Sequence, residues 1–293
     1  MEDKMNTYAQ MQALVAAKLA TVSTNQHLDT FKYAKRVMFD YLWDTDPALL
    51  EVRGHSYDNR TGELVVAAPR KSFNYLENGW WKDVPLDTPV VAYKKFNGFM
   101  ACVSKYEGKT LVSTTGSTKS DFVKLAKDYI AVEDFEWLSD DITLLYEVVH
   151  PKDPHIVDEP IGAHYLGYRS KNNGVFSPYG ESEYTLIGTL KEALEIAEND
   201  RIEGFMIYNL QHDPDRLSPA KIKTPYYIGK KKLMRLSKKN SDIMYNDPVK
   251  FAQALPKMWQ DVPEELVAMY PNGYWNEMPE WFRRGELEQL KGK

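Results

Sequence analysis

The sequence predicts an α+β fold in which antiparallel sheets with flanking helices are followed by a small helical region. Short segments of alternating apolar and polar residues, broken by turn residues, fill most of residues 33–235. Apolar residues at helical spacing occupy only a few stretches among them. Beyond residue 240, prolines and acids at helix-start positions precede short helical stretches. We therefore expect a main domain at residues 1–240 and a small helical C-terminal domain at residues 241–293.

In chain order, the first expected element is an amphipathic helix over residues 8–22, where Met11, Leu14, Val15 and Leu19 recur at helical spacing. Two hairpins follow, joining residues 50–57 to 63–68 and residues 99–104 to 110–113 across glycine-containing turns. Further strands are expected at residues 144–149, 164–168, 204–208 and 220–222. Further helices are expected at residues 117–130 (with Ser117 and Ser120 as candidate caps), 189–198, 249–254, 264–270 and 281–290.

The net charge of −5 argues against a basic coat for long duplex DNA, but it allows a local cationic groove. Basic residues with no acid among them are concentrated between residues 221 and 239. They are Lys221, Lys223, Lys230, Lys231, Lys232, Arg235, Lys238 and Lys239. This block either contacts phosphates or forms a solvated strand face. The single cysteine, Cys102, excludes an internal disulfide and a cysteine-based zinc site, and its apolar neighbours place it in the core.

The sequence shows no signal peptide and no apolar run long enough to span a membrane. The apolar run at residues 13–22 is too short for that purpose. We expect a cytoplasmic protein without a membrane partner, acting as a monomer.

Lys95 is the candidate nucleophile. The motif Lys-x-x-Gly occurs three times, beginning at Lys95, Lys105 and Lys171, and only the first lies between two strand-like runs. An amine attacks phosphorus only in its uncharged form, so we expect burial or neighbouring cations to lower the pKa of Lys95. Gly98, three residues later, allows the backbone to pass close to a nucleotide.

Two carboxylates lie on apolar strand-like segments downstream. Glu147 follows Leu-Leu-Tyr and precedes Val-Val, and Glu203 opens the run Gly-Phe-Met-Ile-Tyr. A carboxylate inside an apolar strand is costly unless it is paired or binds a ligand. Together the two would suit Mg²⁺, with Mn²⁺ as a substitute, beside a nucleotide triphosphate. For Glu147 alone, the alternative is a solvent-facing side chain on an edge strand.

Lys221 and Lys223 are two residues apart, so both side chains point to one face of the expected strand. Two cations on one face suit phosphate binding, and a polar strand face is the alternative. Arg53 and Lys71 lie upstream, and Arg53 is a candidate for a bidentate phosphate contact. The order and spacing of all these residues carry more information than any one of them.

That order resembles the covalent nucleotidyltransferase superfamily, and specifically its branch of phage RNA ligase 1 and the tRNA ligases. The shared motifs read Lys95-Phe-Asn-Gly98, Tyr146-Glu147, Glu203-Gly204 and Lys221-Ile-Lys223. The branch is indicated by Glu51-Val-Arg53-Gly54, by Lys71-Ser-Phe73-Asn74 and by the run from Ser113 to Ser120. The resemblance covers roughly residues 30–235.

The resemblance implies a nucleotidyltransferase (ATP-grasp-like) domain and an ATP-dependent RNA ligase. By the resemblance, Lys95 would carry AMP, Glu147 and Glu203 would serve the ribose and the metal, Lys221 and Lys223 the phosphates, and Arg53 and Lys71 the triphosphate tail. The substrate would be RNA with 5′-phosphate and 3′-hydroxyl ends, of which cleaved tRNA is one example. The branch also implies a bacteriophage protein that repairs RNA in the cytoplasm of a host.

Two alternatives stay open. A DNA ligase or an RNA-capping guanylyltransferase would share the fold, although no oligonucleotide-binding barrel is recognisable after residue 240. A non-catalytic RNA-binding protein is favoured by two departures from the branch pattern. Asn97 stands where the phage relatives usually have aspartate, and Thr115 stands where a lysine is often found. Fungal tRNA ligases resemble this sequence in having an asparagine at the first of these positions.

Overall fold

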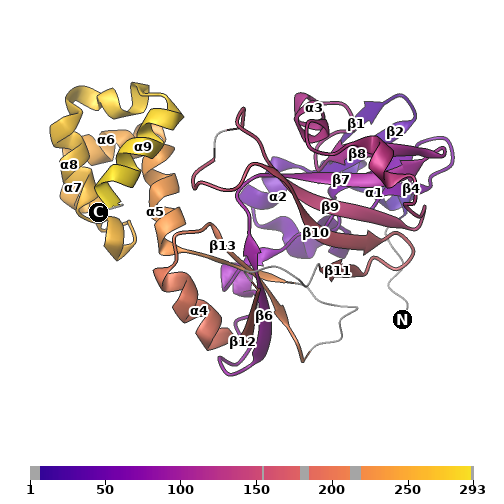
Figure 1. The fold of residues 1–293 in the computed structure, drawn as a ribbon, viewed down its shortest axis with the longest axis horizontal. Helices are drawn as coiled ribbons and strands as arrows, with labels where there is room; N and C mark the ends of the chain where they lie inside the picture. The colour runs from indigo at the N-terminus through magenta and orange to yellow at the C-terminus, as the bar shows by residue number, and fades with distance from the viewer. Residues whose placement is uncertain (1–6, 154, 179–184, 212–218, 292–293) are drawn as a thin grey trace.

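The computed structural model describes residues 7–153, 155–178, 185–211 and 219–291, which form three sheets and a group of helices (Figure 1). The first sheet has the order β1-β2-β3-β4 and is antiparallel throughout. Its strands are β1 (Ala20–Asn25), β2 (Leu28–Tyr33), β3 (Arg53–Asp58) and β4 (Leu64–Val66). The second sheet, also antiparallel, has the order β11-β10-β9-β7-β8. Its strands are β7 (Phe99–Tyr106), β8 (Lys109–Thr114), β9 (Ile142–Val149), β10 (Gly162–Ser170) and β11 (Phe176–Pro178).

The third sheet has the order β12-β6-β13-β14-β5, and its β14–β5 pair is parallel. Its strands are β5 (Phe73–Asn74), β6 (Pro89–Lys95), β12 (Thr185–Thr189), β13 (Gly204–Asn209) and β14 (Ala220–Lys223). Only three residues separate β6 in this sheet from β7 in the second, and they are the last three of the first Lys-x-x-Gly motif. The candidate nucleophile therefore lies where two sheets meet.

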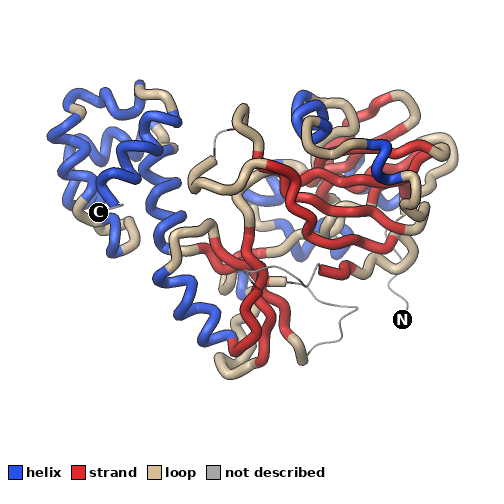
Figure 2. The backbone as a smooth tube through the Cα atoms, in the orientation of Figure 1, coloured by secondary structure: helices blue, strands red, loops and turns tan. Residues whose placement is uncertain are grey.

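Helices cover the sheets and form most of the C-terminal part (Figure 2). The α-helices are α1 (Tyr8–Ala16), α2 (Lys35–Phe39), α3 (Asp121–Lys127), α4 (Leu190–Asn199), α5 (Pro225–Met234), α6 (Lys238–Asn246), α7 (Pro248–Ala252), α8 (Val262–Met269) and α9 (Glu280–Lys291). Short segments of 3₁₀ helix lie at Leu42–Thr45, Pro47–Leu50, Glu77–Gly79, Val132–Phe135, Lys257–Trp259 and Pro271–Glu277. None of the helices in the described part of the chain has the length and apolar character needed to span a bilayer.

Local sequence accounts for several element boundaries. α4 begins in a capping box, in which the hydroxyl of Thr189 accepts from the backbone N–H of Glu192 and the Glu192 carboxylate accepts from Thr189. Ser120 caps α3 as expected, but α3 does not reach back to Ser117. The predicted α+β class, both predicted hairpins and the burial of Cys102 are confirmed.

The predicted helix over residues 8–22 is wrong beyond Ala16. Lys18 adopts a left-handed backbone conformation with φ 59°, which ends the helix, and β1 begins at Ala20. For Lys230–Lys232, the alternative of a solvated strand face is also wrong, because these residues lie in α5. Lys230 is buried there and pairs with Glu288 of α9.

Helices α5 to α9 pack around one apolar cluster, in which Trp259 and Trp275 are completely buried. This helical cluster also contains Tyr227 of α5 and two residues of the loop between β9 and β10, Ile156 and Val157. Residues upstream of position 240 therefore contribute to the helical core. The division of the chain into domains at residue 240 stays a prediction.

Candidate functional site

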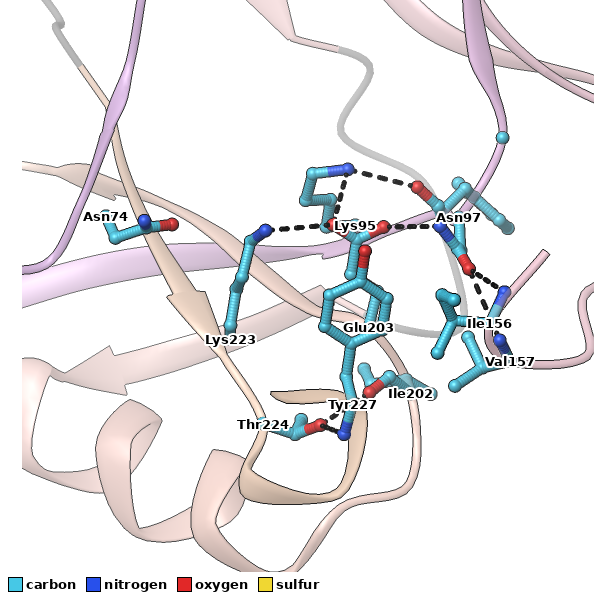
Figure 3. A network of polar contacts seen from close by, with 12 residues as sticks. Asn74, Lys95, Asn97, Ile156, Val157, Ile202, Glu203, Lys223, Thr224 and Tyr227 are labelled. Carbon is cyan, nitrogen blue, oxygen red and sulfur yellow. Dashed lines mark hydrogen bonds and ion pairs between the residues drawn. The ribbon is translucent and has the colours of Figure 1, made fainter. Parts of the chain in front are cut away.

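The end of β6 places Lys95 beside a carboxylate from the neighbouring strand. Gly204 on β13 lies opposite Lys95 on one side and opposite Lys223 on the other. The residue before it, Glu203, has Oε1 3.0 Å from Lys95 Nζ and 3.8 Å from Lys223 Nζ (Figure 3). The two lysines therefore share one carboxylate. The structure brings them together, as we expected from the order of the motifs.

Glu147 approaches the same region from the second sheet. The backbone N–H of Gly98 donates to Glu147 Oε1 at 3.1 Å. A Cβ on Gly98 would lie 2.3 Å from the carbonyl oxygen of Val148, so only glycine permits this approach. β9 lies between β7 and β10 and Glu147 is buried, so the alternative of a solvent-facing residue on an edge strand is wrong.

The charges around Lys95 favour its protonated form. Burial lowers the pKa of the Lys95 amine, but the negative charges of Glu147 and Glu203 outweigh burial and raise the pKa above 10.5. The expectation of a lowered pKa is therefore wrong for this arrangement of the protein. Burial likewise raises the pKa of Glu147, and the charge of Glu203 adds to the increase. A metal cation bound next to the two glutamates would offset their negative charges and so lower the pKa of Lys95.

Lys221 shows the opposite shift. Burial, followed by the charges of Lys71, Arg53, Lys223 and Lys95, lowers the pKa of its amine to about 7. The structure thus brings all five predicted cations close enough together to affect the pKa of Lys221. Such a concentration of positive charge is suited to several phosphate groups at once.

Lys71 is fixed by aromatic rings. Its ammonium group lies 4.4 Å from the centre of the Phe73 ring and 5.1 Å from that of Trp43. Burial lowers the pKa of Lys71, with a further contribution from the charge of Arg53. Arg53 opens β3 on the first sheet, opposite Lys32 of β2. All three sheets therefore contribute a charged residue to the candidate site.

Sequence reasoning missed the role of Asn97 and Tyr227. The Asn97 amide donates to Glu203 Oε2 at 3.0 Å, and its carbonyl oxygen accepts from the backbone N–H groups of Ile156 at 2.8 Å and Val157 at 3.3 Å (Figure 3). Tyr227 bonds to the Asn97 side chain, and burial together with the charge of Glu203 raises the pKa of its hydroxyl. A sequence signal was available for Tyr227. The Thr-Pro pair directly after Lys223 is typical of a helix start, and it places Tyr227 in the first turn of α5.

Glu147 and Glu203 fit a magnesium ion that also binds substrate phosphates. The described residues contain no group of three or more histidine, cysteine or acidic side chains that would hold a metal unaided. Mg²⁺ is commonly bound by one or two carboxylates together with phosphate oxygens and water. Both glutamates are buried, and each would have to exchange part of its present hydrogen bonding for the ion.

No family model matches the chain, and no curated protein matches it. Among solved structures, an archaeal ATP-dependent RNA ligase is similar over 97% of this chain and 78% of its own, with a TM-score of 0.53 and 14% identity. A second structure of an archaeal ATP-dependent RNA ligase covers 95% of this chain and 75% of its own, also at 0.53 and 14%. A protein from Aquifex aeolicus described as an ATP-dependent DNA ligase covers 97% and 80%, at 0.53 and 13%. At this identity the likeness shows the fold alone, so the chain has the fold of these three ligase structures.

Proposed function

We propose that this protein is an ATP-dependent RNA ligase that joins 5′-phosphate and 3′-hydroxyl ends through a lysyl-AMP intermediate. The observation that carries the proposal is the convergence of Lys95 and Glu203 with Glu147 inside a cluster of cations. The similar structures named as ATP-dependent RNA and DNA ligases support the use of ATP and a nucleic-acid substrate. The resemblance of the motifs to the RNA ligase 1 branch favours RNA.

In the first step, Lys95 loses a proton to water and its amine attacks the α-phosphorus of ATP. A nitrogen–phosphorus bond forms, and the bond from the α-phosphorus to the oxygen bridging it to the β-phosphorus breaks. Pyrophosphate leaves with that electron pair, and the nitrogen now bound to phosphorus gives its excess proton to water. Lys221 and Lys223 would hold the phosphates around the reacting centre, while Arg53 and Lys71 would hold the β- and γ-phosphates that depart.

A bound magnesium ion, held by Glu147 and Glu203, would neutralise negative charge on the phosphates. The cations of this chain serve the same end. They would stabilise the charge that spreads over the phosphate oxygens while the reaction proceeds. Catalysis would rest on positioning and charge stabilisation.

In the second step, an oxygen of the RNA 5′-phosphate attacks the phosphorus of lysyl-AMP and the nitrogen–phosphorus bond breaks. The Lys95 nitrogen takes up a proton from water and leaves as the free amine. The product is RNA with AMP joined to its 5′ end by a phosphoanhydride. In the third step, the 3′-hydroxyl of a second end attacks the 5′-phosphate of the RNA. AMP departs, the hydroxyl proton is released, and a phosphodiester bond remains.

Incubation with ATP labelled at the α-phosphate tests the proposal. We expect a covalent, acid-labile label on the wild type and none on Lys95→Ala. Lys105→Ala and Lys171→Ala are matched controls, because each of these lysines also begins a Lys-x-x-Gly sequence. Lys105 lies at the end of β7 remote from Gly98, and Lys171 follows the far end of β10, so both variants should label normally. Absence of a Lys95-dependent adduct would overturn the proposal.

A DNA ligase is the second candidate, because the Aquifex aeolicus structure shows the same TM-score as the archaeal RNA ligases. Both functions predict the adduct with ATP, so the substrate must separate them. We expect sealing of nicked or single-stranded RNA and little sealing of the matching DNA. Preferential sealing of DNA would favour the second candidate, and an adduct formed with GTP in place of ATP would contradict both.

A further inference from the structure

Four consecutive residues between β9 and β10 connect the strand that carries Lys95 to the helical cluster. The backbone N–H groups of Ile156 and Val157 donate to Asn97 Oδ1. The side chains of the same two residues are 1% and 3% exposed and belong to the apolar core of the helices. The backbone of this pair thus faces the site while its side chains anchor it elsewhere.

The next two residues also form one contact with the helices and one with the strand that carries Lys95. Asp158 Oδ1 lies 3.3 Å from Arg284 Nη1 on α9, and Glu159 Oε2 lies 2.7 Å from Lys94 Nζ on β6. Lys94 and Lys95 are neighbours on a strand and point to opposite faces. The end of β6 is therefore held by Glu159 on one face and by Glu203 on the other.

Asn97 joins this segment to the reacting groups, and its amide suits both sides. Its nitrogen can donate to the ionised Glu203 while its oxygen accepts from two backbone N–H groups. An ionised aspartate at this position would keep the acceptors but lose the donor, and it would place like charge against Glu203. The asparagine is matched to its surroundings in this chain.

We propose that Asn97 is a positioning residue, which fixes the Glu203 carboxylate and with it Lys95, and which ties both to the helical cluster through residues 156–159. The inference rests on the proposed function, since the geometry that it protects is that of lysyl-AMP formation. By this inference, the helices help to hold the reacting groups in place, although no predicted site residue lies among α6 to α9.

The test compares Asn97→Asp with Asn97→Leu in the full chain, by the rate of adduct formation from α-labelled ATP. Both variants lose the hydrogen bond to a charged group, so both rates should fall about 10- to 100-fold. Asn97→Asp also adds a carboxylate beside Lys95, so its rate should reach half its maximum at a higher pH than in the wild type. Asn97→Leu adds no charge and should keep the wild-type pH midpoint. The charged groups around Lys95 in this comparison are Glu147, Glu203, Lys221, Lys223 and Arg53.

Asn172→Asp is the matched control, because the Asn172 amide also donates to a carboxylate, that of Asp141, on an exposed loop. Its rate and pH midpoint should equal those of the wild type. Wild-type rates in both Asn97 variants would overturn the inference and leave the proposed function intact. Slow labelling of both with the wild-type pH midpoint, accompanied by a matching loss of thermal stability, would reduce Asn97 to a structural role and also overturn it. Failure of the wild type to label would instead contradict the proposed function.

Discussion

Lys95 and Glu203 form an ion pair of 3.0 Å across two adjacent strands, at the end of β6 and the start of β13. Burial lowers the pKa of Lys95, but the charges of Glu147 and Glu203 raise it, so the ion pair favours the ammonium form of the proposed nucleophile. Its second oxygen accepts a hydrogen bond from the Asn97 amide, which holds the orientation of the carboxylate. Losing the proton from Lys95 is thus a separate requirement before attack, and this makes the proposed reaction dependent on pH.

Glu203→Gln should shift that dependence downward. The negative charge of Glu203 raises the pKa of Lys95, so a neutral amide in its place should lower the pKa, and adduct formation should reach half its maximum at a lower pH. The maximal rate should fall about tenfold or more, because a charged contact in the site is lost. Labelling with α-labelled ATP from about pH 8 to about pH 12, a range that includes the ordinary pKa of a lysine, measures both quantities. An unchanged or higher midpoint would show that Glu203 does not control the protonation of Lys95.

Gly98→Ala should destabilise the protein. The added Cβ would meet the carbonyl oxygen of Val148 at 2.3 Å and its carbon at 2.8 Å, both in a buried strand that cannot easily yield. Overpacking of this kind costs about 2 kcal/mol, which corresponds to a fall in Tm of about 4 to 8 °C.

Gly285→Ala provides the matched comparison for this substitution. Gly285 lies within α9, and nothing comes within 4 Å of a Cβ placed there. Alanine is favoured over glycine in a helix, so this variant should melt at or slightly above the wild-type temperature. Thermal denaturation of both variants decides the matter. Equal stability of Gly98→Ala and the wild type would mean that the loop relaxes away from β9.

Local signals in the sequence predicted much of the fold. The hairpin of β7 and β8 was predicted because its turn contains Gly108, which adopts φ 71°. The ordered motifs also identified the residues that the structure brings together around Glu203. What escaped prediction depends on distant partners. For Lys230 in α5, the sequence left a phosphate contact and a solvated strand face as alternatives, because its actual partner, Glu288, lies 58 residues further along the chain.

The electrostatics of the site could not be read from composition. The lysines of the other motifs predicted a lowered pKa for Lys95. Burial does lower this pKa, but Glu147 and Glu203, which approach Lys95 from two different strands, raise it by more. It is the pKa of Lys221 that is lowered instead, by burial and by cations that come from different elements. The pKa of each lysine depends on its distances in space to all neighbouring charges, and the spacing of residues along the chain does not determine these distances.

Lys221→Met should stabilise the protein at neutral and acidic pH. In the unfolded chain Lys221 keeps its proton up to about pH 10.5, whereas in the folded chain it keeps it only below about pH 7. The unfolded state therefore binds more protons between these values, so the charge of Lys221 costs stability fully below pH 7, and the cost disappears as the pH rises toward 10.5.

The gain in Tm should be about 5 °C or more at pH 6 and should shrink steadily toward pH 10. Lys221→Arg keeps the positive charge and should show no such gain. Thermal melting of the three proteins across this range is the measurement. A constant difference between Lys221→Met and the wild type at all pH values would attribute the effect to packing rather than to the charge.

Arg53→Gln and Lys71→Gln should impair the first chemical step selectively. If these two cations hold the β- and γ-phosphates, their contribution ends when pyrophosphate leaves. Loss of one charge-assisted contact should slow adduct formation about 10- to 100-fold, whereas sealing of RNA that already carries AMP at its 5′ end should stay within about threefold of the wild type.

Lys223→Gln is the contrasting variant, since Lys223 shares a glutamate oxygen with Lys95 itself and should affect both steps. Parallel assays with ATP and with pre-adenylylated RNA separate the steps, and equal losses in the two assays for Arg53→Gln would place this arginine at the reacting phosphorus instead of the departing phosphates.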